Sequence, residues 1–271
     1  MESRSSTKDL QERPRHGWQV GVAMAGLVVG ASFLPAAFLA TLMVAIASVT
    51  AFGLGRSLIR RSLPIRKQLA VVLVVLFVLL AAYQQEPGLL LGATVALMVM
   101  ASAYMSGRVE ARSVPAFASS VLLVFYIGFD VSYLALIRGL DAGPRLVSAL
   151  VVMIVSFRIA RNLVPGGGSL VIAPGSGSEL RWLPAAAGVA ASILGAAISV
   201  TFLNSALGVF TTIILGALVG LASAIGELGA GLLMSSDGHP SRGLARDILE
   251  QVVPALLAAP AFFYGIRLYL T

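Results

Sequence analysis

Charged side chains interrupt this apolar sequence at only a few places, and one of those places is Glu227. It lies inside the apolar stretch Ile225–Gly229. A carboxylate within a membrane segment costs about 3 kcal/mol unless it is paired or hydrated, so such residues are candidates for function. Glu227 is therefore a candidate catalytic carboxylate or metal ligand. The alternative is that a span ends near Gly226 and Glu227 lies at the membrane surface.

A second group of reactive side chains follows shortly after. Carboxylate oxygens suit Mg²⁺, which retains waters and bridges to substrate phosphates, and guanidinium groups suit phosphate. The group therefore predicts a site for Mg²⁺ and phosphate, or else an ordinary loop whose charges only set the orientation of the chain. Its members are Asp237, His239, Arg242, Arg246 and Asp247.

Two further arginines, Arg158 and Arg161, lie three residues apart near the end of an apolar run. This spacing places them on neighbouring positions of one helix face, where they could contact lipid phosphate or extend to the membrane surface. The glycine-rich segments 165–169 and 175–178 lack the lysine of a phosphate-binding P-loop. We interpret them as linkers.

The composition defines the elements that must position these residues. Hydrophobic residues make up 58% of the 271 positions and charged residues 11%, and the mean hydropathy is +0.93. The apolar runs are continuous, and a backbone that spans lipid must satisfy its own hydrogen bonds. The sequence therefore predicts an all-α polytopic membrane protein. The absence of cysteine excludes disulfides and thiolate metal sites, and the two histidines cannot form a polyhistidine site.

Breaks in hydropathy divide the chain into about nine transmembrane helices. Proline, glycine or charge marks the breaks, as at Pro35 and at Glu86-Pro87-Gly88, because proline disfavours helix at the preceding residue. The predicted spans are 18–33, 36–54, 68–85, 88–106, 114–135, 145–164, 183–203, 208–226 and 252–270.

The basic residues predict the orientation of these spans. With the N-terminus inside, all but Arg138, Arg145 and Arg267 of the 19 Lys and Arg residues fall on the cytoplasmic side, as the positive-inside rule requires. We therefore expect a multi-pass protein of the inner (plasma) membrane. Orientation also accounts for the net charge of +7, so we expect no nucleic-acid partner. The predicted organisation is a cytoplasmic tail (1–16) and one transmembrane domain (17–271), with cytoplasmic loops at 55–67, 107–113, 158–181 and 234–251.

Glycine and alanine are abundant in 185–232. Small residues let membrane helices approach closely, so this region predicts tight helix packing. Such helix faces are also compatible with a homodimer.

The whole arrangement resembles the bacterial phosphatidate cytidylyltransferase (CDP-diacylglycerol synthase) family. The likeness includes the short basic tail, the paired first hydrophobic stretch, the Gly/Pro loop after the sixth span and a final proline-containing helix. Gly226-Glu227-Leu228 corresponds to the G-D-L motif of the family. Counting back from Pro254 aligns Gly238-His239 and Asp247 with the closing G-H…D signature.

Several motif residues of the family are replaced in this chain. In the S-P-K-K-T/S-W-E-G loop, Pro174 and Glu179 match, but both lysines are lost. The span before that loop has an alanine at Ala160 but lacks the aspartate of the family. Leu244 and Ala245 occupy the D-R pair of the closing signature. Asp237 stands where the family has the aspartate of its K-D pair.

The resemblance implies an enzyme that converts CTP and phosphatidate to CDP-diacylglycerol and diphosphate. Glu227, Asp237 and Asp247 would hold Mg²⁺, and Glu179, Glu227 and Asp247 would be the catalytic residues. The substrate-binding residues would be Arg158, Arg161, Arg181, His239, Arg242 and Arg246.

The missing lysines and aspartates favour a second hypothesis, a non-catalytic relative, over an active enzyme. Phosphoryl-type transfer depends on positioning and charge stabilisation, and losing one such donor lowers a rate by about 10²–10³. A non-catalytic relative would keep the fold and bind anionic lipid or a partner membrane protein. A transporter is a third hypothesis, but internal repeats, its usual sign, are not visible in the sequence.

Overall fold

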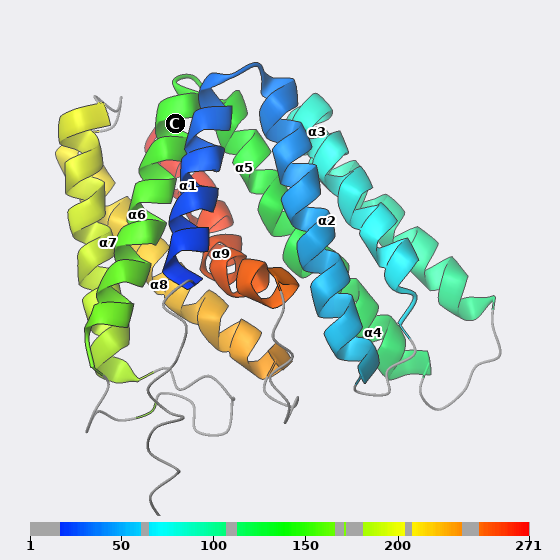
Figure 1. Ribbon diagram of the computed structural model, residues 1–271. Helices are drawn as coiled ribbons and strands as arrows, with labels where there is room; N and C mark the ends of the chain where they lie inside the picture. Colours follow the sequence, from blue (N-terminus) through cyan, green and yellow to red (C-terminus); the bar gives the residue numbers. More distant parts are fainter. Residues whose placement is uncertain are drawn as a thin grey trace, which may run out of the picture.

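The computed structural model describes residues 17–60, 65–106, 113–165, 171, 181–203, 208–234 and 244–270. These residues are almost entirely helical (Figure 1), apart from an isolated β-bridge between Val171 and Arg181. Six of the described helices are long and apolar enough to cross a membrane, and two shorter apolar helices lie at Gly21–Phe33 and Ala255–Tyr269. This confirms the predicted all-helical class.

The first break confirms the prediction at Pro35. Helix α1 (Gly17–Phe33) ends two residues before the proline, and α2 (Ala36–Arg60) begins immediately after it. Proline suits this position because a helix start leaves its backbone N–H groups without intrahelical partners.

Helix α3 (Lys67–Met105) consists of two helical halves joined by a sharp break at Gln85, whose φ is 58° and ψ −136°. Its two halves fold back on each other. A Cβ added at Gly92 would lie 3.3 Å from the ring of Phe77, fifteen positions earlier in the chain. The predicted break at residues 86–88 therefore falls one residue earlier, and Pro87 lies in the first turn of the second half.

The next long helix consists of three segments, α4 (Ser113–Val124), the π-helical turn η1 (Phe125–Phe129) and α5 (Asp130–Gly139). It continues four residues beyond the predicted end at 135. Gly128 of η1 packs closely on α3, because a Cβ there would lie 3.4 Å from the Cα of Val74. Helix α6 (Gly143–Leu163) follows, with Pro144 in its first turn.

Glycines bring the last helices together, as the sequence predicts. Helix α7 (Trp182–Leu203) packs between α6 and α8 (Val209–Met234), and α9 (Leu244–Leu270) packs on α8. A Cβ added at Gly195 would lie 2.7 Å from Ser156 Oγ, and one at Gly216 would lie 2.7 Å from Ala196 Cβ. The backbones can therefore approach only because these side chains are absent.

The helix ends gather at two ends of the molecule (Figure 1). The connections α1–α2 and α5–α6 lie at the upper end with the C-terminus, and the helix ends that adjoin 61–64, 107–112 and 235–243 lie at the lower end. We name these the Glu86 end and the Glu227 end, after the carboxylates nearest to them. Helix α8 continues eight residues beyond its predicted end, and α9 begins eight residues before its predicted start. Glu227 is therefore inside a helix.

Candidate functional site

The Glu227 site is formed by α6 and α8, which pack against each other. Arg161 lies in the last turn of α6, where the helix dipole favours a cation. Its Nη1 donates to Glu227 Oε1 at 2.9 Å, and its Nε lies 2.8 Å from Oε2. The two side chains therefore form an ion pair with two close contacts, of which the one to Oε1 is a charge-assisted hydrogen bond.

The two partners differ in burial. The Glu227 side chain is 7% exposed, whereas the Arg161 side chain is 26% exposed. Glu227 Oε2 is buried and accepts no well-aligned hydrogen bond from a described residue. Arg161 therefore faces partly outward, while the carboxylate is held inside the bundle.

Arg158 adds a second positive charge to this site. It lies one turn before Arg161 on α6 and interacts electrostatically with Glu227. Glu227 therefore interacts with two arginines that lie one turn apart on the same helix.

Tyr126 connects the site to the π-helical turn. Its hydroxyl donates to the carbonyl of Gly226 at 3.1 Å, and a Cβ added at Gly229 would lie 3.7 Å from the same oxygen. Tyr126 therefore contacts the backbone of α8 directly beside Glu227.

The other predicted site residues are only partly placed by the structure. Arg181 lies at the start of α7, in the bridge with Val171. Arg246 and Asp247 lie in the first turn of α9, and their side chains are outside the described part of the structure. Glu179, Asp237, His239 and Arg242 lie outside the described residues altogether. Of the predicted set, the structure brings together Arg158, Arg161 and Glu227.

A metal centre is not formed by the described residues alone. They contain no group of three or more His, Asp or Glu side chains that could hold an ion. Both oxygens of Glu227 lie against Arg161, so this carboxylate already has a positive partner. Any Mg²⁺ bound at Glu227 would have to displace that arginine.

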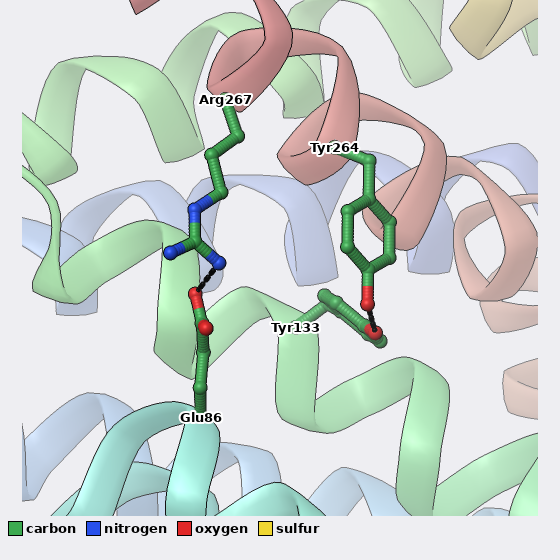
Figure 2. A network of polar contacts seen from close by, with 4 residues as sticks. All are labelled: Glu86, Tyr133, Tyr264 and Arg267. Atoms are coloured by element: carbon green, nitrogen blue, oxygen red, sulfur yellow. Dashed lines mark hydrogen bonds and ion pairs between the residues drawn. The ribbon is translucent and has the colours of Figure 1, made fainter. Parts of the chain in front are cut away.

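A second polar network lies at the Glu86 end and was missed from the sequence (Figure 2). Glu86 of α3 forms an ion pair with Arg267 of α9, and the hydroxyls of Tyr133 and Tyr264 hydrogen-bond at 2.8 Å. With the predicted spans, Glu86 and Arg267 both fall on the outer side of the membrane. Their pairing across 181 positions has no local sequence signal.

Comparison with known proteins adds no family. No protein-family model matches the sequence, and no curated protein matches it. The fold alone defines the class: this is a multi-pass α-helical membrane protein.

Proposed function

We propose that the chain spans the inner (plasma) membrane nine times, with its N-terminus and its Glu227 end in the cytoplasm. The break at Gln85 divides α3 into two apolar halves, and α1 and α9 supply two further apolar segments. Among the described residues, Arg56, Arg66 and Arg161 of the predicted cytoplasmic set lie in or beside helix ends at the Glu227 end (Figure 1). The positive-inside rule supports this orientation.

We further propose that the Glu227 site binds the phosphate headgroup of an anionic membrane lipid, with phosphatidate as the specific candidate. The observation that carries this proposal is the pair of arginines, Arg158 and Arg161, that interact with Glu227 at the membrane end of α6. Arg161 retains enough exposure to contact a phosphate. Arginine can bind phosphate with two parallel hydrogen bonds.

In this proposal Glu227 competes with the lipid for Arg161. Glu227→Gln should therefore strengthen phosphatidate binding by about tenfold, equivalent to one charge-assisted hydrogen bond. Arg161→Gln should weaken it, and Arg145→Gln, at the opposite end of α6, should leave it unchanged. The measurement is an equilibrium titration of the purified protein with short-chain phosphatidate, with phosphatidylcholine of equal chain length as the comparison.

Two results would overturn this proposal. Phosphatidate could bind no more tightly than phosphatidylcholine. Alternatively, Glu227→Gln could remove binding in a folded protein, which would mean that the carboxylate itself holds the ligand or its metal.

The second candidate is the phosphatidate cytidylyltransferase reaction, supported by the carboxylate at Gly226-Glu227-Leu228 and by Asp247. It requires Mg²⁺ and CTP, and it makes the opposite prediction for Glu227→Gln, namely loss of activity. The test is formation of CDP-diacylglycerol from CTP and phosphatidate in lipid micelles, beside a family member with complete motifs. Product above background with the wild-type chain, lost in Glu227→Gln, would establish the enzyme.

A further inference from the structure

Asp130 is a buried carboxyl group inside the apolar helix Ser113–Gly139. It is 4% exposed, and no described residue forms a hydrogen bond or ion pair with its carboxyl group. Nine residues of helix separate it from Gly139, or about 13 Å at 1.5 Å per residue. It therefore lies within the bilayer, not at its surface.

The helix changes geometry at this residue. The π-helical turn Phe125–Phe129 ends immediately before Asp130, and single π turns inside α-helices occur frequently at functional sites. The turn is well packed, because Gly128 within it lies against Phe77 and Val74 of α3. The fold therefore holds Asp130 in a defined place.

Aromatic rings enclose this part of the bundle. Phe129 lies 6.1 Å from Phe77 and 5.0 Å from Tyr133 between ring centroids, both edge to face. Phe125 also packs edge to face on Phe77 at 5.7 Å. A carboxylate in such surroundings is unfavourable because it loses its hydration. Binding a proton removes the charge without requiring additional space.

Two tyrosine hydroxyl groups, those of Tyr133 and Tyr264, lie between Asp130 and the Glu86 end. Tyr133 follows Asp130 by three residues, on the neighbouring position of the same helix face, and interacts with it electrostatically. The buried hydroxyl of Tyr133 hydrogen-bonds that of Tyr264 at 2.8 Å (Figure 2). Tyr264 is 56% exposed, so one of the two tyrosines is accessible.

Among the described residues, Tyr126 and Tyr133 of its own helix interact electrostatically with Asp130, and Arg138 lies further along in the last turn of that helix. On α3 and α9, Glu86 and Tyr264 interact with Tyr133, and Arg267 pairs with Glu86. Helix α4 carries no ionisable side chain. The described charges of the remaining neighbours lie near helix ends, namely Arg56 on α2 and Arg145, Arg158 and Arg161 on α6.

We propose that Asp130 is an intramembrane proton-binding site reached from the Glu86 end through Tyr264 and Tyr133. A hydronium ion at that end gives a proton to the Tyr264 oxygen and becomes water, and Tyr264 passes its own hydroxyl proton to Tyr133. Tyr133 passes its proton to the Asp130 carboxylate as that group turns towards it. One proton enters, one carboxylate becomes a carboxylic acid, and both tyrosines end with one proton each.

The route ends at Asp130. Tyr126, on the other side, donates its hydroxyl proton to the Gly226 carbonyl, which cannot pass a proton onward. Through the described hydroxyl groups the site therefore exchanges protons with the Glu86 end, and this inference is independent of the proposed phosphate site.

The test is infrared spectroscopy of the purified full-length protein in lipid, at neutral pH and after transfer to D₂O. We expect a carboxylic-acid carbonyl band in the wild type that is absent in Asp130→Asn. Tyr264→Phe and Tyr133→Phe should slow the deuterium shift of that band by about tenfold or more, since each removes a proton carrier. Tyr269→Phe, which alters another exposed tyrosine of α9, should exchange like the wild type.

The proposal is overturned if the wild-type band is missing at neutral pH, or if it persists in Asp130→Asn. It is also overturned if Tyr264→Phe exchanges as fast as Tyr269→Phe. Where Asp130→Asn does not fold, Asp130→Glu keeps a carboxyl group at the position. That variant must move the band in frequency, and an unmoved band would assign it to another residue.

Discussion

Arg161 and Glu227 form a buried ion pair whose partners have unequal access to water. Without Arg161, a carboxylate that is 7% exposed would be left without its partner, whereas without Glu227 an arginine that is 26% exposed can still turn towards water. Breaking a buried pair by removing one partner typically costs about 3–5 kcal/mol because the remaining charge is uncompensated. The cost should therefore depend on which partner is removed.

Arg161→Met should lower the thermal unfolding midpoint in detergent well below the wild-type value, and Glu227→Gln should lower it less. The exposed pair Glu86–Arg267 provides the matched control, because an exposed ion pair contributes about 1 kcal/mol or less. Glu86→Gln should therefore leave the midpoint nearly unchanged. Equal losses in Arg161→Met and Glu86→Gln would show that the Glu227 site is not a buried pair.

Individual residues were only partly predictable from the sequence. Glu227 stands out because a carboxylate in an apolar stretch needs a partner, but the partner lies 66 positions away, and no local spacing indicates it. The predicted span 114–135 would end five residues after Asp130 and leave it near the membrane surface. The helix continues to Gly139, which puts the carboxyl group inside the bundle.

At the scale of the elements, glycines determine how closely α7 and α8 pack. A Cβ at Gly216 would lie 2.7 Å from Ala196 Cβ and 2.9 Å from Ile193 Cα, and one at Gly220 would lie 2.9 Å from Val189 Cα. Helix α8 cannot move away from α7 without losing part of its contact with α9. A single methyl group at Gly216 should therefore disturb two interfaces.

Gly216→Ala should destabilise the protein by about 1–3 kcal/mol, the usual cost of overpacking. Gly30→Ala on α1 is the control, because a Cβ there meets nothing within 4 Å, and alanine favours helix over glycine by about 1 kcal/mol. Thermal unfolding of both variants in the same detergent makes the comparison. If Gly216→Ala is as stable as Gly30→Ala, the result would contradict the close contact between α7 and α8 at Gly216.

The predicted helix boundaries were accurate where proline marks them. The break before Pro35 was confirmed, and the break near Pro87 moved by one residue, to Gln85. Elsewhere the boundaries were less accurate. Helix α8 passes through Gly226 without interruption, because glycine alone does not end a helix that is packed on both sides.

At the scale of the whole molecule, the proposed topology can be tested with single introduced cysteines, because the chain has no cysteine of its own. Ser106 lies at the Glu227 end of α3, and Asp141 lies in the connection between α5 and α6; both are exposed. In intact cells, a membrane-impermeant maleimide should label Asp141→Cys and not Ser106→Cys. After the cells are opened, it should label both. The reverse pattern would place the Glu227 end outside.

Phosphate-headgroup binding at the Glu227 end is the central claim of this account. The most direct measurement is native mass spectrometry of the protein released from its own membrane, which identifies the lipids that remain bound. The wild type and Arg145→Gln should retain a lipid with a terminal phosphate, and Arg161→Gln should lose it. An identical set of bound lipids in all three proteins would contradict the claim.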